Sequence, residues 1–282
     1  MTLWGGSPDA GRRLAALALA GAVVALALLA SNLAPYDASR PDFDALLAPP
    51  GTTHLLGADE LGRDVLSRLL VAGRMSLWIG TASVASSFVI GALAGMSAGY
   101  FRSWVDAFVM RSVDLISAFP AVLLALALGA TLGPGLGNVI VAIAAVNLPV
   151  FARLARTQTL VVRELGFVEA RRSLGFGPVD ILFRTVAPNI SPPLLTQACL
   201  LFGSSILLES YLSFLGVGIQ PPTPTLGRML HDAIGFLDQA PWLVCFPGFA
   251  IFLAVLGFNL LGDWMNDNLD PRENLIDFEA GT

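Results

Sequence analysis

Five long stretches of this chain contain no Asp, Glu, Lys or Arg, and they restrict the fold more than any other feature of the sequence. They are residues 14–34, 75–101, 115–152, 185–208 and 239–262. A helix of about 20 apolar residues crosses the roughly 30 Å core of a bilayer, so each stretch is long enough to span a membrane. Only 13% of the residues are charged, against about 25% in soluble domains. The chain is therefore predicted to be an all-α membrane protein.

The third stretch is too long for a single crossing, because its 38 residues would extend about 57 Å as a helix. Its Gly133-Pro134-Gly135 cluster is a turn signal, and predicts a third and a fourth helix joined by a tight turn. The third helix is expected to begin earlier, near Asp106. Residues 14–34 exceed the roughly 7 to 15 residues of a signal-peptide core and predict a retained first span. The expected total is six transmembrane helices.

Two features suggest how these helices meet and bend. Gly91, Gly95 and Gly99 are spaced four apart, which lets helices approach closely in lipid, although glycines are also simply tolerated in apolar helices. Pro120 and Pro149 each remove a backbone donor and are expected to loosen the third and fourth helices. Such kinks suit a pore that rocks between two faces, which makes Pro120 a gating candidate, but they also occur in static bundles.

An amphipathic helix is expected just before the second span, with Asp59 as its N-cap. Val65, Leu66, Leu69 and Leu70 would form its apolar face. Such helices commonly anchor at the membrane surface, so we favour an anchor over a substrate gate.

Three charged residues within or beside the spans are candidates for translocation or gating. Arg111 and Asp114 stand at i and i+3 of the third helix and are expected to pair. Glu209 lies inside the fifth span, where a carboxylate is costly unless it is paired or faces water. A hydrogen bond between helices is the alternative role for Glu209.

Composition excludes several kinds of chemistry. All sixteen basic residues are arginine, so the chain lacks the lysine that a P-loop uses to reach nucleotide phosphates. Cys199 and Cys245 fall inside predicted spans, where lone cysteines act as small apolar residues. His54 and His231 have no ligand-like spacing. We expect no metal site, no catalytic residues and no cofactor in this chain, and no nucleic-acid partner.

The distribution of arginine predicts the orientation. Residues 35–74 contain six acidic residues and four arginines, whereas residues 153–188 contain six arginines and three acidic residues. With Arg12 and Arg13 inside, the number of crossings places residues 35–74 outside and 153–188 inside. Both termini are then cytoplasmic.

The segment between the fourth and fifth spans is predicted to form two short helices with a stiff corner. In the first helix, residues 164–174, Phe167, Ala170 and Leu174 would share the apolar face, and Glu164, Arg171 and Arg172 would be solvated. Gly175-Phe176-Gly177 breaks this helix, and Pro178 suits the first position of the next.

The second short helix shows the apolar spacing of an amphipathic helix, with Val179, Leu182, Phe183 and Val186 at i, i+3, i+4 and i+7. Pro188 is expected to end it. From the residues alone, the pair is either an interfacial helix pair on the membrane surface or a surface presented to a soluble partner.

Glu169-Ala170 followed by Gly175, with Pro188 thirteen residues later, resembles the EAA loop of permease subunits in ABC importers. Further motifs resemble the second-subunit permeases for dipeptides, oligopeptides and nickel, which are binding-protein-dependent inner membrane components. These motifs are Leu56-Gly57, Asp59, Leu61–Arg68, Ile116–Pro120, Leu212–Gly216, Gln220–Pro224, Ala240–Trp242, Phe258–Asp263 and Asp270–Arg272.

This resemblance implies an ABC type-1 importer (MetI-like) transmembrane fold with a cytoplasmic coupling helix. It implies an N-terminal span, external loop and interfacial helix over 1–72, a transmembrane domain over 73–263 with its coupling loop at 163–188, and a cytoplasmic tail over 264–282. The residues expected at the ATPase contact are Phe167, Glu169, Ala170, Arg171, Arg172, Gly175, Phe176 and Pro178. Arg171 and Arg172 would pair with acidic residues of the ATPase or with anionic lipid headgroups.

The resemblance also implies the partners. These are a homologous permease subunit forming a heterodimer, two P-loop ATPase subunits that bind ATP and Mg, an extracytoplasmic substrate-binding protein, and the lipid of a bacterial or archaeal plasma (inner) membrane. Short peptides are the leading substrate, and nickel or a metal chelate is the alternative. A self-contained carrier or channel is the competing function, but it would require ion-coupling residues, for which only Glu209 and the Arg111/Asp114 pair are candidates.

Overall fold

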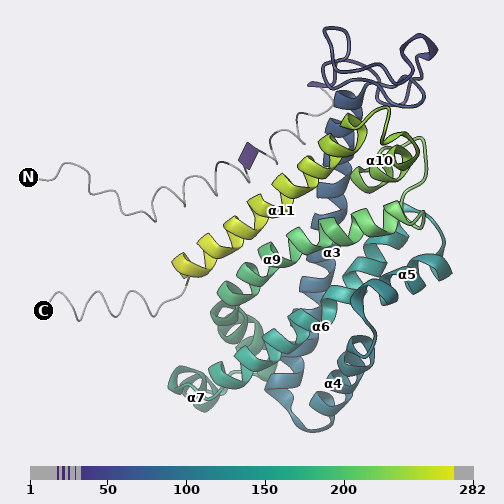
Figure 1. The fold of residues 1–282 in the computed structure, drawn as a ribbon. Coiled ribbons are helices and arrows are strands. Elements are labelled where there is room, and N and C mark those ends of the chain that lie inside the picture. Colours follow the sequence, from purple (N-terminus) through teal and green to yellow (C-terminus); the bar gives the residue numbers. More distant parts are fainter. Residues whose placement is uncertain (1–17, 19–20, 23–24, 26–28, 30–32, 270–282) are drawn as a thin grey trace, which may run out of the picture.

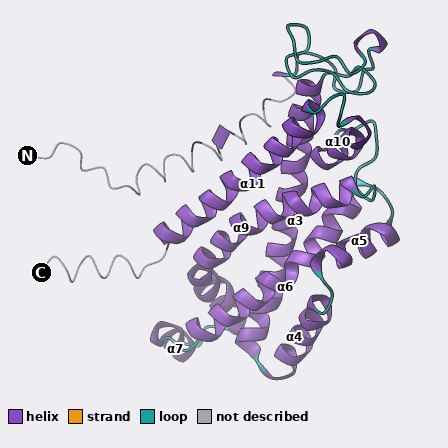
Figure 2. Ribbon diagram, viewed as in Figure 1, coloured by secondary structure: helices purple, strands orange, loops and turns teal. Residues whose placement is uncertain are grey.

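The computed structural model describes residues 33–269 and the isolated positions 18, 21, 22, 25 and 29. Within this part the chain consists of helices and loops, without strands (Figure 2). The α-helices are α3 (Val65–Phe101), α4 (Ser103–Ser117), α5 (Ala121–Leu132), α6 (Leu136–Val162), α7 (Gly166–Ser173), α8 (Pro178–Ile181), α9 (Ala187–Phe214), α10 (Leu226–Ala233) and α11 (Trp242–Leu269). Short helical turns lie at η1 (Phe43–Ala45), η2 (Leu182–Val186) and η3 (Ile234–Phe236).

Four helical segments of the described part are long and apolar enough to cross a membrane: Val65–Phe101, Leu136–Val162, Pro178–Phe214 and Trp242–Asn266. α4 and α5 together pass the same test but meet at an angle of 89°, so they count as a fifth span only if the bent pair is one crossing. The predicted first span, residues 14–34, lies largely outside the described residues. The structure therefore supports four or five of the six expected spans.

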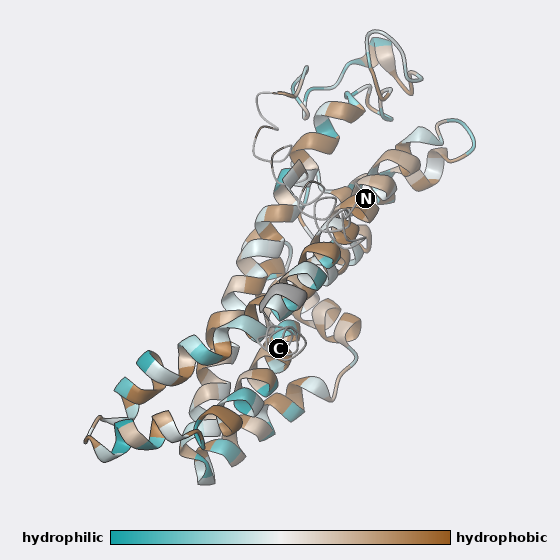
Figure 3. Ribbon diagram, turned by 90° about the vertical axis from the view of Figure 1, so that its left-hand side faces the viewer, coloured by the Kyte–Doolittle hydropathy of each residue, from teal (hydrophilic) through white to brown (hydrophobic). Residues whose placement is uncertain are grey.

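The long helices α3, α6, α9 and α11 form the body of the bundle (Figure 1). The folded loop that precedes α3, which we call the outer loop after its predicted side of the membrane, lies at one end together with α10, and α7 lies at the other. Figure 3 shows apolar residues along the helices between these ends and hydrophilic residues among the loop segments and around the α7 elbow. This distribution agrees with a bundle whose middle lies in lipid and whose two ends meet water.

The spaced glycines of α3 form its contact with α6. A Cβ atom added at Gly95 would lie 2.1 Å from the carbonyl oxygen of Ala152, which is closer than atoms can approach. Gly91 and Gly99 are similarly close to Phe151 and to Arg156. Of the two readings of this spacing, close helix approach is the one that the structure shows.

Two expected helix boundaries are wrong. Asp64, not Asp59, caps α3, because its carboxylate accepts hydrogen bonds from the backbone N–H and the hydroxyl of Ser67. The expected interfacial helix is not a separate element but the first turns of the 37-residue α3. The boundary drawn between residues 72 and 73 therefore falls inside a continuous helix.

Pro188 does not end the second short helix of the inner segment, which continues through η2 into α9. η2 is a π-turn in which the Ala187 N–H bonds to the Leu182 carbonyl, five residues back. Proline has no N–H to donate, and in an α-helix its ring collides with the carbonyl four residues earlier. The wider turn accommodates Pro188, and the Asn189 side chain bonds to the Thr185 carbonyl at 2.6 Å.

The third span is broken rather than loosened at Pro120. α4 ends at Ser117, and Pro120 is the residue immediately before α5. Pro149, in contrast, is buried inside an uninterrupted α6. A proline thus coincides with a break in one span and is accommodated inside the other. The backbone bends at Pro120, whereas α6 continues through Pro149.

Candidate functional site

The inner elbow, residues 163–188, contains the corner that the sequence predicts. α7 ends where Gly175 adopts a left-handed backbone with φ of +83°, which glycine accommodates without steric cost. The N–H groups of Gly175 and Phe176 bond to the carbonyls of Arg172 and Arg171, the two bonds of a Schellman motif. Pro178 then occupies the first turn of α8.

The expected apolar face of the first short helix is wrong. Phe167, Ala170 and Leu174 point to solvent, and Leu174 is 76% exposed. The residue that packs inward is Val168, which is fully buried in a cluster with Ile181, Leu182 and Val186. Glu164 and Arg172 are exposed as expected, and Glu169 is exposed as well.

Five exposed apolar side chains of the elbow are together called the inner-elbow patch. Its members lie on α7, α8, η2 and the corner between them, and each is at least 41% exposed: Phe167, Leu174, Phe176, Val179 and Phe183. Large apolar side chains exposed at the water-facing end of a membrane bundle suit either a protein-docking surface or contact with the membrane surface.

Arg171 was expected to be solvated, but it turns inward. Its Nη1 donates a 2.7 Å hydrogen bond to the Thr185 hydroxyl, and its guanidinium lies 4.7 Å from the centre of the Phe176 ring. The Asp180 carboxylate is 3.9 Å away. Arg171 therefore ties α7 to the helix that leads into α9.

The translocation candidates are not brought together as one group. Asp114 pairs with Arg153 of α6 at 3.0 Å, instead of pairing with Arg111 as expected. Arg111 is exposed, and Pro120 stands at the bend between α4 and α5. A neighbouring contact that was not predicted joins Asp106 to Arg156, whose Nε and Nη2 donate to the two carboxylate oxygens of Asp106 at 2.5 and 2.6 Å.

Glu209 is completely buried and lies among hydroxyl groups. It accepts hydrogen bonds from Ser76 of α3 at 3.0 Å and from Ser213 of its own helix at 2.7 Å. Thr225, immediately before α10, also contributes its hydroxyl. This carboxylate therefore joins α3, α9 and the start of α10, which is the interhelical role that the sequence left open.

An apolar cavity of about 390 Å³ lies between α3, α9, α10 and α11. Residues from all four helices line it, and Ser76 is the only one with a polar side chain. Because the Ser76 hydroxyl donates its proton to Glu209, the described residues that line the cavity offer no free side-chain donor to a polar solute.

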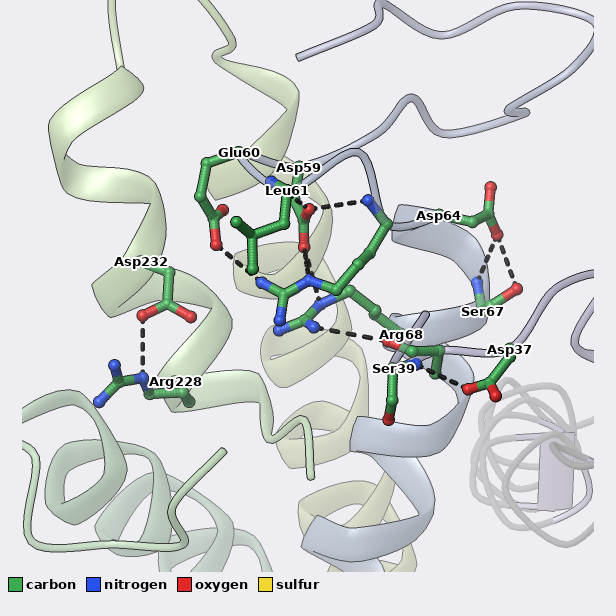
Figure 4. A network of polar contacts seen from close by, with 12 residues as sticks. Asp37, Ser39, Asp59, Glu60, Leu61, Asp64, Ser67, Arg68, Arg228 and Asp232 are labelled. Atoms are coloured by element: carbon green, nitrogen blue, oxygen red, sulfur yellow. Dashed lines mark hydrogen bonds and ion pairs between the residues drawn. The ribbon is translucent and has the colours of Figure 1, made fainter. Parts of the chain in front are cut away.

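A buried network of charges organises the outer loop (Figure 4). The Asp59 carboxylate accepts from the backbone N–H groups of Leu61 and Arg63 and from the Arg63 Nε at 2.7 Å. Arg68 of α3 approaches the same carboxylate to 3.2 Å. The sequence singled out Asp59 but not this network, for which the clustering of opposite charges over residues 59–68 was the available signal.

Glu60 belongs to the same network through a 2.7 Å bond from Arg63. Its pKa is nevertheless raised above the ordinary value of 4.5, because burial and then the neighbouring charge of Asp59 disfavour the ionised carboxylate. Asp64 and His54 form a second buried pair at 3.0 Å beside it. The outer loop is thus a folded cap, held by specific contacts.

Comparison with known proteins identifies relatives over most of the chain. The family model described as "Binding-protein-dependent transport system inner membrane component" matches residues 89–274. The chain is 44% identical over 251 residues to a glutathione transport system permease protein, GsiD, of Pectobacterium atrosepticum, covering 89% of this chain and 83% of the relative. It is also 44% identical over 256 residues to a di/tripeptide transport system permease protein, DppC, of Pseudomonas aeruginosa, covering 89% and 84%.

A third relative is a dipeptide transport system permease protein, DppC, of Alkalihalophilus pseudofirmus, 43% identical over 226 residues, covering 80% of this chain and 74% of the relative. Among solved structures, the inward-facing MetNI methionine ABC transporter aligns with a TM-score of 0.57 at 18% identity, covering 70% of this chain and 93% of that chain. This likeness supports a MetI-like transmembrane fold. The chain is a multi-pass transport component rather than an enzyme, and it belongs to the family of binding-protein-dependent transport system inner membrane components, the permease subunits of ABC importers.

Proposed function

We propose that this protein forms half of the translocation pathway of an ATP-driven importer for short peptides, and that ATPase subunits drive it through the inner elbow. The observation that carries the proposal is the inner-elbow patch, where Phe167, Leu174 and Val179 are exposed on a corner with a defined backbone. A partner that covered these side chains would gain the free energy of burying them. The elbow also projects at the end of the bundle opposite the outer cap (Figure 1).

The partners follow from the same proposal. A homologous permease subunit supplies the other half of the pathway, and two P-loop ATPase subunits bind ATP and Mg. An extracytoplasmic binding protein docks on the outer loops, residues 35–74 and 216–240. Both termini are cytoplasmic, which is consistent with the excess of arginine in residues 153–188.

Short peptides are the proposed substrate class because the three relatives reported above are named for glutathione, di/tripeptides and dipeptides. Nickel or a metal chelate is the alternative within the same family. Uptake of labelled glutathione, a dipeptide and Ni²⁺ into proteoliposomes containing the whole importer separates these substrates. Ni²⁺ uptake without peptide uptake would overturn the peptide assignment.

The translocation candidates have different roles in this proposal. Pro120 marks the 89° bend between α4 and α5, where a broken span can change its angle. Asp114 holds α4 to α6 through Arg153. Glu209 is enclosed by hydroxyl groups and fixes helices rather than meeting the solute.

The coupling surface can be tested with one matched pair of substitutions in the assembled importer. Leu174→Asp places a charge in the inner-elbow patch, and Leu215→Asp places one on another exposed leucine just beyond the C-terminal end of α9. We expect Leu174→Asp to lose at least about tenfold in co-purified ATPase, as expected for a buried interface anchor, while Leu215→Asp retains it. Normal ATPase recovery and transport with Leu174→Asp would exclude coupling through the elbow.

A further inference from the structure

Arg171 differs from Arg172 and Arg184, the two exposed arginines beside it in the inner elbow, in what it contacts. Arg172 is exposed, and Arg184 is 76% exposed while it pairs with Asp180 at 3.1 Å. Arg171, in contrast, is one third exposed and lies one turn beyond the buried Val168, on the face of α7 that packs against the second helix of the elbow. Its guanidinium already has a hydroxyl and an aromatic ring as neighbours within the chain.

The hydroxyl partner of Arg171 lies at an unusual place in the backbone. Thr185 is only 7% exposed and belongs to η2, the π-turn that joins α8 to α9. Its carbonyl accepts a hydrogen bond from the side chain of Asn189 in the first turn of α9. π-turns inside helices are rare and are often found at functional sites. Any displacement of Thr185 is therefore transmitted directly to the start of a transmembrane helix.

The two backbone bonds of the corner tie Gly175 and Phe176 to α7, but they do not reach η2. Residues 174–177 join α7 to α8 through the left-handed Gly175 and the extended Gly177, and two glycines in four residues leave this linker few side-chain constraints. Val168 adds an apolar contact, which has no preferred direction. The Arg171–Thr185 hydrogen bond is directional and joins α7 to η2 at one defined distance of 2.7 Å.

We propose that Arg171 is a positioning residue that transmits movement of α7 to α9 through Thr185, and that it is not a contact residue for the ATPase. This inference rests on the proposed coupling function of the elbow. The Phe176 ring and the Asp180 carboxylate hold the guanidinium in the orientation that reaches Thr185. Movement of the inner-elbow patch then reaches α9, the helix that carries Glu209, without requiring rearrangement of the linker.

The test measures peptide molecules transported per ATP hydrolysed, in proteoliposomes containing the complete importer. Arg171→Ala and Thr185→Val remove the two ends of the bond, while Arg184→Ala, at an arginine of the elbow whose side chain is 76% exposed, is the control. Thr185→Ser keeps the hydroxyl and removes only the methyl group, so this variant should transport like the unmodified importer. A role of Thr185 in packing alone would instead impair Thr185→Ser as well. A hydrogen bond to a charged group corresponds to about a tenfold effect, so we expect the ratio to fall about tenfold in Arg171→Ala and Thr185→Val.

Two results beyond the ratio decide the proposal. ATPase co-purification should stay within about twofold of the unmodified importer in both variants, because Arg171 and Thr185 bond to each other rather than to the ATPase. The double variant should be no worse than either single variant, as expected for two ends of one interaction.

A normal transport-to-ATP ratio in Arg171→Ala, impaired transport in Thr185→Ser, or additive losses in the double variant would each overturn the proposal. Loss of ATPase binding in Arg171→Ala would instead show a contact residue. All of these outcomes leave the coupling function standing, because that function fails only if Leu174→Asp still binds the ATPase and transports.

Discussion

Ser76 of α3 donates a 3.0 Å hydrogen bond to Oε2 of Glu209 of α9, although 133 residues separate them in the chain. Ser213 occupies the other carboxylate oxygen at 2.7 Å, and Glu209 has no exposed surface. A buried carboxylate is tolerated when hydrogen bonds replace its lost hydration. Glu209 therefore stabilises the contact between two spans and the beginning of α10.

Replacing Glu209 with Ala should destabilise the protein by roughly 2–5 kcal/mol, because it leaves hydroxyl groups unpaired and opens a cavity. Glu209→Gln keeps the shape and one acceptor, so it should cost less. Thermal unfolding of the purified protein in detergent measures both, with Ser204→Ala, an exposed hydroxyl of the same helix, as the control. Equal melting temperatures for Glu209→Ala and the control would contradict this role.

Gly95→Ala should disrupt the contact between α3 and α6. The added methyl group would lie 2.1 Å from the Ala152 carbonyl oxygen, and relieving such overpacking typically costs about 1–3 kcal/mol. Gly73 of the same helix has open space around its Cβ position, so Gly73→Ala should leave the melting temperature unchanged or raise it. Similar behaviour of the two variants would show that α3 and α6 separate more easily than the close approach suggests.

The two ion pairs between α4 and α6 should differ in strength. Asp114 and Arg153 are 64% and 50% exposed in their side chains, and exposed pairs contribute about 0–1 kcal/mol. Asp106 and Arg156 form two short bonds at lower exposure, so Asp106→Ala should lower the melting temperature more than Asp114→Ala. The reverse order would mean that Asp106 is already hydrated in the protein.

Removing Asp59 should unfold the outer cap. The variant Asp59→Ala leaves the buried guanidinium groups of Arg63 and Arg68 without their shared carboxylate, and breaking a buried pair on one side costs roughly 3–5 kcal/mol. We expect rapid cleavage of residues 36–64 by protease added from outside. Asp44→Ala, an exposed position of the same loop, is the control and should resist cleavage like the unmodified protein.

The raised pKa of Glu60 predicts a pH dependence. Because the folded protein holds the Glu60 proton more tightly than the unfolded chain, the protonated group stabilises the fold fully below its ordinary pKa of 4.5. This contribution declines as the pH rises through the raised pKa. The melting temperature of Glu60→Gln relative to the unmodified protein should therefore increase from pH 4 to pH 7. A difference that stays constant, or that decreases with pH, would contradict the shift.

Several elements follow from local sequence alone. The spans α3, α6, α9 and α11 are predicted from the length of the uncharged stretches that they contain. A charge-free stretch of that size has few stable environments outside a membrane. The corner at Gly175–Pro178 was predicted because glycine and proline restrict the backbone wherever they stand. The bend at Pro120 was only partly predicted, since Pro149 gives the same local signal and lies in a continuous helix.

The partners of charged residues were not predictable in this way. The pairing of Asp114 with Arg111 was wrong because Arg153 lies 39 residues further along the chain and approaches only when α4 packs beside α6. Asp59 was predicted to be the N-cap of a helix, but its carboxylate pairs with Arg63 and Arg68. Asp64 is the N-cap of α3 instead.

The sequence by itself determined that this protein crosses a membrane, that its inner segment turns at Gly175, and which family of transporters it resembles. These properties depend on composition and on the backbone preferences of single residues. Only the tertiary structure decided that Val168 and Arg171 face inward while Phe167 and Leu174 face solvent. A helix as short as α7 has too few turns to establish an apolar face, so the position of η2 and α9 decides which side is buried.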